Sequence, residues 1–129
     1  MTPKFRAWTE EGKVMYYDVF PFKDDTLLLS YDEIAFDEVP ASDFILMQST
    51  GLFDKNGEEI FEGDIIKYKK YNYGFIYTGV VGYDTIGLMK KDDEIGLIST
   101  FVGMSIKNID LGSVKVVGNI YENPELLGE

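Results

Sequence analysis

The most informative part of the chain runs from Phe44 to Tyr68 and reads FILMQSTGLFDKNGEEIFEGDIIKY. It holds two apolar runs, Phe44 to Leu52 and Ile60 to Tyr68, on either side of a polar turn. Asn and Gly accept the left-handed backbone that a tight turn requires. The stretch therefore predicts two antiparallel strands joined at Asn56 and Gly57.

The second strand of this hairpin loses its alternation around Gly63, since Ile60-Phe61 and Ile65-Ile66 are both adjacent apolar pairs. Such a break predicts a bulge or a corner at the glycine. We interpret four residues at the turn and the corner as a signature of the fold and not as an active site. They are Asn56, Gly57, Gly63 and Asp64.

Shorter apolar segments precede this hairpin. Lys4 to Trp8 and Val14 to Phe20, separated by Gly12, predict a first hairpin. Leu27 to Leu29 predicts a short buried strand or a helical turn. Residues 31 to 43 fit neither the helical nor the strand period, and Pro40 limits any helix there.

After Tyr68, strand signals recur at short spacing and are divided by Gly, Asn and Asp. This pattern is typical of a small meander or barrel, and we expect an SH3-like barrel or a similar curled sheet in residues 63–121. Asn123 and Pro124 then predict one helical turn through Leu127. The predicted strands are Phe75 to Tyr83, Gly87 to Met89, Glu94 to Met104 and Val114 to Ile120.

Length and pattern together predict the architecture. The 129 residues fit one domain, and we expect a mainly β chain built as a small antiparallel domain with two lobes, at residues 1–62 and 63–129. A β-rich α+β fold is the alternative.

The composition removes most catalytic chemistry. The chain has no cysteine, no histidine and one arginine, Arg6. Thiolate catalysis, imidazole bases and ligands, and bidentate arginine clamps are thereby absent or nearly so. We expect no enzyme activity, no catalytic residues, no cofactor and no metal. The chain also has no apolar leader and no run of membrane-spanning length, so we expect a cytoplasmic protein.

The formal net charge of −11 is concentrated in the first half of the chain. Residues 1–64 hold 15 acidic and 5 basic side chains, whereas residues 65–129 hold 8 and 7. Between Asp24 and Asp43 there are seven carboxylates and no basic residue. Such a field repels nucleic acid and attracts basic partners.

One segment interleaves lysines with aromatic residues, a combination suited to following a phosphate backbone while stacking bases. The alternative interpretation is an ordinary strand end with solvated lysines and packed tyrosines, and the acidity of the chain favours it. The candidate contact residues for nucleic acid or a protein partner are Lys67, Lys69, Lys70, Tyr71 and Tyr73.

Other chemistry-bearing patterns favour structural roles. Asp24-Asp25 and Asp92 to Glu94 are better read as solvated turns than as cation ligands, because neighbours on a strand point to opposite faces. The Asp54 to Glu59 segment lacks the spacing of a calcium loop. Trp8 with its aromatic neighbours is better read as core packing than as a ligand platform.

In combination, Lys4 to Trp8, the central hairpin with Glu62-Gly63-Asp64, and Gly118 to Pro124 resemble the YopX family. That family consists of small proteins, encoded mainly by bacteriophages and prophages of Gram-positive bacteria, with no established biochemical activity. The resemblance spans essentially the whole chain. It implies phage or prophage origin, an intracellular setting, a mostly β structure and self-association, and it supplies no catalytic residues.

Four functional hypotheses follow. The first is a non-enzymatic phage or prophage accessory protein that self-associates, as a homo-oligomer, or binds a host or phage protein. The second is single-stranded nucleic-acid binding through Lys67 to Phe75. The third is an acidic decoy for a basic host protein through Asp24 to Asp43. A metal nuclease built from carboxylates alone is the least favoured reading.

Overall fold

The computed structural model of the chain describes residues 4–30, 32, 34–69, 76–82, 85–91, 103–105 and 111–127. In these residues the regular elements are β-strands and short 3-10 helices, with no α-helix among them. The prediction of a mainly β chain is confirmed. The chain divides into two compact units, Met1–Ser49 and Thr50–Glu129, which are described separately.

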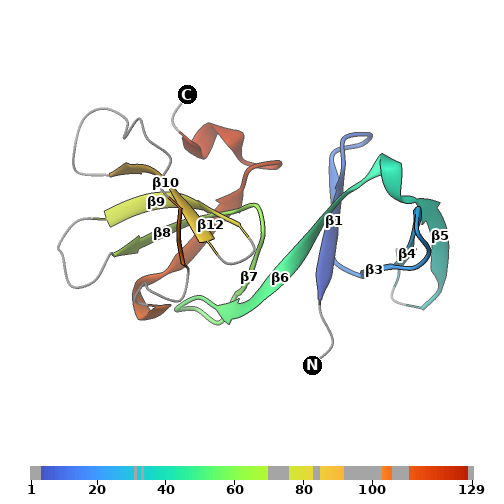
Figure 1. The fold of residues 1–129 in the computed structure, drawn as a ribbon, viewed down its shortest axis with the longest axis horizontal. Helices are drawn as coiled ribbons and strands as arrows, with labels where there is room; N and C mark the ends of the chain where they lie inside the picture. The colour runs from blue at the N-terminus through green and yellow to red at the C-terminus, as the bar shows by residue number, and fades with distance from the viewer. Residues whose placement is uncertain are drawn as a thin grey trace. The chain divides into compact units, whose positions relative to one another are not determined.

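The first unit contains two small sheets and the start of a long strand (Figure 1). In one sheet β1 lies between β2 and the first half of β6, and in the other β4 lies between β3 and β5. The elements are β1 (Phe5–Thr9), β2 (Val14–Tyr16), β3 (Val19–Pro21), β4 (Thr26–Ser30), β5 (Phe36–Pro40), the 3-10 helix η1 (Ala41–Asp43) and β6 (Ile45–Phe53).

The first hairpin forms as predicted, with Gly12 at a φ of 80° in its turn. However, the predicted strand from Val14 to Phe20 is two strands. β2 pairs with β1 and stops at Tyr16, after which β3 pairs with β4 instead. The change of partner places Val19 opposite Leu29, where both side chains are buried. Tertiary pairing thus overrides what reads locally as one strand.

Leu27 to Leu29 lies in a strand, β4, and the ambiguous residues 31–43 supply its partner, β5. The inner face of this sheet carries Leu27, Leu29 and Val39 into the core of the first unit. Buried Ala7 and Val19 complete that core, and Tyr16 and Phe44 pack on it with their rings edge to face at 6.1 Å.

The central hairpin forms at the predicted position. Asp54 N–H donates to the Glu58 carbonyl at 2.8 Å, and Gly57 N–H donates to the Asp54 carbonyl at 3.0 Å. Gly57 has a φ of 83°, so the left-handed residue expected in this turn is present. The strands that this turn joins are β6 and β7 (Glu59–Phe61).

Gly63 forms the predicted corner after β7, with a φ of 87°. Its N–H donates to the Val81 carbonyl at 2.8 Å, and its carbonyl accepts from Ile120 N–H at 2.9 Å. Both backbone groups of this residue are therefore used by strands distant in sequence.

The main sheet of the second unit has five antiparallel strands in the order β11-β10-β9-β8-β12, of which Figure 1 labels β8, β9, β10 and β12. Register shifts between Leu88 and Lys90 and between Val116 and Gly118 favour strong twist and curl. The predicted curled sheet in residues 63–121 is confirmed. Its strands are β8 (Asp64–Lys69), β9 (Ile76–Val81), β10 (Thr85–Lys91), β11 (Gly103–Ser105) and β12 (Lys115–Asn119).

Two 3-10 helices flank β12, namely η3 (Leu111–Ser113) and η4 (Pro124–Leu127). The second is the helical turn predicted from Asn123 and Pro124. The part of the predicted strand Glu94 to Met104 that precedes Gly103 lies outside the described residues.

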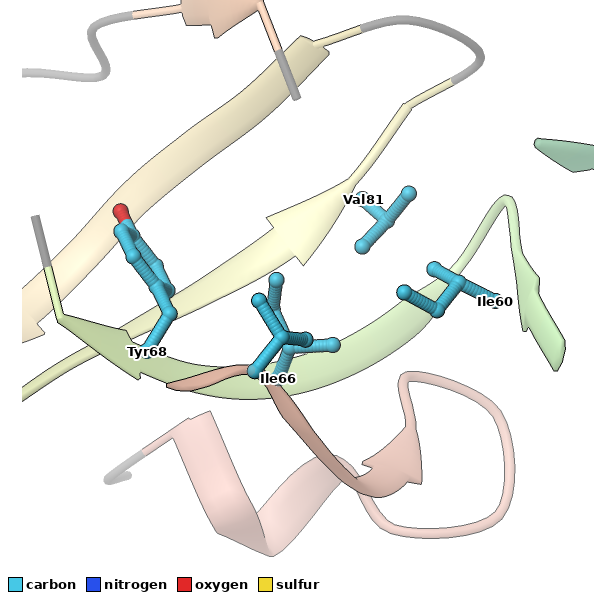
Figure 2. Packing of buried hydrophobic residues seen from close by; sticks show 5 residues of the cluster. Ile60, Ile66, Tyr68 and Val81 are labelled. Carbon is cyan, nitrogen blue, oxygen red and sulfur yellow. The ribbon is translucent and has the colours of Figure 1, made fainter. Parts of the chain in front are cut away.

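Figure 2 shows Ile66 and Tyr68 of β8 on one face of the sheet with Val81 of β9 and Ile60 of β7. Val114 belongs to the same buried cluster. Ile60 joins this core because Gly63 turns the chain between β7 and β8. Residues 50–62 therefore lie in the second unit.

Candidate functional site

The outer face of the β3-β4-β5 sheet carries several exposed apolar side chains. Because residues two apart on a strand share a face, the inward side chains of Leu27 and Leu29 direct Leu28 outward. Phe20 lies opposite Leu28 on β3, and Phe36 lies opposite Ser30 on β5. Phe22, two residues after Phe20, follows the end of β3.

These aromatic rings touch one another while remaining open to solvent. The centroids of Phe20 and Phe36 are 5.8 Å apart across β4. Phe20, Phe22 and Phe36 are 40%, 51% and 42% exposed. We call Phe20, Phe22, Leu28 and Phe36 the aromatic face. Exposed apolar groups gathered in this way typically mark a contact surface for another molecule.

Carboxylates surround the aromatic face. Glu38 lies opposite Leu28 on β5, within the same row as Phe20. Asp24 and Asp25 are exposed in the turn between β3 and β4. The nearby cation is Lys23, whose Nζ lies 3.7 Å from Glu38 Oε2 and 5.5 Å from the Phe22 ring centroid. Exposed pairs of this kind contribute little to stability.

At the loop that leads into β5, Asp32 orders the backbone. Its Oδ1 accepts hydrogen bonds from Ile34 N–H at 2.9 Å and Ala35 N–H at 3.2 Å. These two bonds hold the pKa of Asp32 below its ordinary value. The carboxylate therefore stays charged at neutral pH beside the start of the strand.

The sequence-predicted contact segment is only partly described. Lys67 lies in β8 directly opposite Lys115 of β12, and Lys69 is the last residue of β8. Lys70, Tyr71 and Tyr73 lie outside the described residues. The structure thus brings Lys115 beside Lys67, a neighbour that the sequence could not reveal because 48 positions separate the two.

The four fold-signature residues have structural roles. Asn56 and Gly57 form the hairpin turn, and Gly63 forms the corner. Asp64 is buried, and its Oδ2 accepts a hydrogen bond from Phe61 N–H at 2.8 Å across that corner. A carboxylate engaged in this way stabilises the turn.

Asp54 is a further structural residue that sequence reasoning missed. Its side-chain Oδ1 accepts from Asn56 N–H and Glu58 N–H, both at 2.8 Å, and its Oδ2 accepts from Val116 N–H at 3.0 Å. Burial acts to raise the pKa of Asp54, but these three amide hydrogen bonds, from Val116, Glu58 and Asn56, outweigh it and lower the pKa overall. The charged carboxylate therefore joins the hairpin turn to β12.

The ending of the chain, from Gly118 to Pro124, is also explained by packing. Asn123 Oδ1 accepts from Asn119 N–H at 3.2 Å, and Asn119 Oδ1 accepts from Tyr121 N–H and Glu122 N–H. A Cβ atom built on Gly118 would lie 2.6 Å from Asn123 Oδ1. Only glycine leaves room for this arrangement, so the Gly118 to Pro124 pattern is structural.

The remaining sequence candidates are Asp24-Asp25, Asp92 to Glu94 and Trp8. In the described part of the chain, no group of three metal-ligating side chains comes together. Asp92 to Glu94 lie outside it. Trp8 is 2% exposed, with its Nε1 donating to Glu10 Oε2 at 2.9 Å, and Arg6 is buried beside Tyr17. These residues form core contacts, in agreement with the packing interpretation.

No helix among the described residues has the length and apolar character needed to cross a membrane.

Comparison with known proteins gives the family. The family model described as YopX protein matches residues 4–128. The chain belongs to the YopX family. A crystal structure of protein EF1440 from Enterococcus faecalis has 30% sequence identity to it, covering 98% of this chain and 99% of that chain, with a TM-score of 0.59. No curated protein matches the chain significantly.

Proposed function

We propose that this YopX-family chain is a non-enzymatic protein-binding module whose contact surface is the aromatic face. The observation that supports this most is the contact of Phe20 with Phe36 at 5.8 Å while both rings stay about two-fifths exposed. Aromatic side chains are enriched in protein interfaces, where they supply large contact area at low entropic cost.

The family resemblance indicates where such a module would act. We propose an accessory protein of a phage or prophage that acts inside the host cell, without a cofactor. Partners in that setting are proteins of the host or of the phage, and the exposed carboxylates of residues 24–43 favour basic ones over nucleic acid.

The aromatic face can be tested by affinity capture from cells that express the gene. We expect the tagged wild-type chain to retain at least one partner protein that a Phe20→Ser, Phe36→Ser double variant loses. Phe53→Ser is the matched control, because Phe53 is 53% exposed and lies on β6, outside the aromatic face. A partner set that is identical for all three chains would contradict the proposal.

Single-stranded nucleic-acid binding remains a second candidate because Lys115 lies opposite Lys67 and enlarges its basic surface. Such binding should fall steeply as salt is raised. Gel retardation of single-stranded DNA by the wild type and by a Lys67→Ala, Lys69→Ala, Lys70→Ala variant tests it. Equal retardation by the two proteins would rule out this segment as the contact.

A further inference from the structure

Some backbone N–H and C=O groups of β5 point away from β4, at the free edge of the sheet. The hydrogen bonds that β4 makes show which ones they are. Ala41 N–H donates to the Asp25 carbonyl at 2.8 Å, whereas Ser30 N–H donates to the Asp18 carbonyl at 3.0 Å and Phe22 N–H to the Thr26 carbonyl at 3.0 Å. Odd-numbered residues of β4 therefore bond to β5, and even-numbered ones bond to β3.

The same alternation applies along β5. Asp37 and Val39 direct their N–H and C=O groups toward β4, while Phe36, Glu38 and Pro40 direct theirs away from it. In the described residues β5 is an outermost strand of its sheet, so these outward groups have no strand beside them. Pro40, which lacks an N–H, occupies an outward position, as expected for proline in an edge strand.

On this edge, the residues whose N–H and C=O groups point outward in the plane of the sheet are also those whose side chains lie on the aromatic face. Phe36 and Glu38 therefore combine outward amides with side chains on the aromatic face. Asp37 is exposed on the opposite face. A strand added to β5 would therefore contact the Phe36 ring and the carboxylates of Asp37 and Glu38.

A second copy of this chain is a poor occupant of the edge. Glu38 is the central residue of Phe36–Pro40, so a symmetric antiparallel pairing of two β5 strands places Glu38 opposite Glu38. Like charges directly opposite each other destabilise a strand pair. Acidic side chains on an exposed edge also protect it from pairing with its own kind.

We propose that β5 is a docking edge for a basic, extended segment of a partner protein, which adds to the sheet as an antiparallel strand. The inference rests on the proposed protein-binding function and gives it a partner class. Read from its N-terminus, the segment carries a basic residue opposite Glu38, a second one opposite Asp37 and an apolar residue opposite Phe36. Main-chain hydrogen bonds supply affinity in this mode, and alternate side chains supply specificity.

The test uses the full-length chain labelled with nitrogen-15 and a capped peptide of sequence Ser-Thr-Lys-Lys-Phe-Thr-Ser. We expect chemical-shift changes centred on the amides of Phe36 and Glu38, and slower hydrogen exchange of these two amides. Binding should weaken as salt is raised, because the carboxylates are exposed.

Three matched peptides test separately the contributions of charge, of the apolar contact and of the main-chain hydrogen bonds. Replacing both lysines by glutamate should weaken binding by at least about tenfold, since like charges then meet on the edge. Replacing the phenylalanine by serine should weaken it through loss of the contact with Phe36. Methylating the backbone nitrogens of the first lysine and of the phenylalanine removes the donors that face β5, and should abolish the slower exchange.

A charge-reversed protein completes the design. Glu38→Lys should weaken binding of the lysine peptide and strengthen binding of the glutamate peptide, and an unchanged spectrum elsewhere shows that the fold is kept. Equal binding of lysine and glutamate peptides, full binding of the methylated peptide, or shifts confined to the second unit would each overturn the proposal. If instead capture from cells depends on Phe20 and Phe36 while no peptide binds, protein binding stands and strand addition fails.

Discussion

At the scale of single residues, the turns of this chain depend on a few backbone and carboxylate positions. Gly57 and Gly63 adopt positive φ values that side chains with a Cβ rarely accept. Asp54 and Asp64 accept amide hydrogen bonds at the two ends of β7. Substitutions at these positions should therefore act on stability and leave the aromatic face intact.

Gly57→Val should destabilise the chain by about 1 to 3 kcal/mol, because a β-branched residue is strained at positive φ. A Cβ at this position meets nothing within 4 Å, so the cost is that of the backbone alone. Chemical denaturation measures it, with Lys55→Ala in the same turn as the control at under about 0.5 kcal/mol. An unchanged midpoint for Gly57→Val would contradict the turn geometry.

Asp54→Ala should cost about 3 kcal/mol at neutral pH, because it leaves three amides without their charged acceptor. The exposed Asp24, changed to alanine, is the control and should have little effect. Denaturation with urea compares the two variants with the wild type.

The effect of Asp54 should also depend on pH. Its folded pKa lies below the ordinary value of 3.8, so the contribution is complete above that pH and is lost as pH falls through the folded pKa. The difference in stability between wild type and Asp54→Ala should shrink below about pH 4. A difference that stays constant down to pH 2 would show that the carboxylate charge is not what stabilises the turn.

At the level of elements, two packing features belong to the paired strands β8 and β12: a bulge in β12 and a buried tyrosine on β8. The bulge near Gly118 lets β12 continue into the Asn119 to Asn123 turn. One face of β8 buries Tyr68 against Ile66 and Tyr77. Both features can be tested with small changes in side-chain volume or polarity.

Gly118→Ala should destabilise the chain by about 1 to 3 kcal/mol, because the added methyl group overlaps Asn123 Oδ1. Asn123→Ala removes that atom and should cost about 1 kcal/mol through the lost hydrogen bond to Asn119 N–H. If the clash is the cause, the double variant should be more stable than the sum of the single effects predicts. Strict additivity would show that Asn123 Oδ1 and Cγ are not the source of the strain, which would leave the Asn123 Cβ atom, 2.9 Å from the added methyl group.

Tyr68→Phe should leave stability at neutral pH within about 0.5 kcal/mol of the wild type or raise it, because the buried hydroxyl makes no hydrogen bond within the described residues. Burial, and secondarily Tyr77, raises the pKa of Tyr68 to about 12. The wild type should therefore lose stability as pH rises from 10 toward 12, and the variant should lose less. Denaturation at a series of alkaline pH values measures this.

At the scale of the whole molecule, charge sets how copies of the chain meet. The net charge of −11 opposes self-association at low salt, whereas exposed apolar side chains such as Ile45, Leu46 and Phe53 favour it. The two effects respond oppositely to ionic strength, because salt screens charge and leaves apolar contact in place.

We expect the chain to form a homo-oligomer whose share grows as salt is raised from about 0.01 M to 0.15 M, where the screening length falls from about 30 to 8 Å. Light scattering after gel filtration, across a concentration series, measures the mass. A monomer under all conditions would limit the proposed function to contacts with other proteins.

Features that depend on local backbone sterics could be predicted from the residue types. The hairpin turn at Asn56 and Gly57, the corner at Gly63, the first turn at Gly12 and the 3-10 helix after Asn123 all lie where residue type predicts them. A positive φ or a proline restricts a few neighbouring bonds only, so its consequence can be read from a few letters.

Which strands pair, and which side chains stay exposed, depends on contacts between segments that are distant in sequence. Residues 36–40 have no clear period, yet they form a strand because β4 offers its unpaired amides, and that pairing brings Phe36 to Phe20. Likewise, Asp54 meets Val116 across 62 residues. Such contacts form only when distant segments meet, and no local pattern encodes them. The aromatic face and the docking edge of β5 are therefore properties of the folded chain.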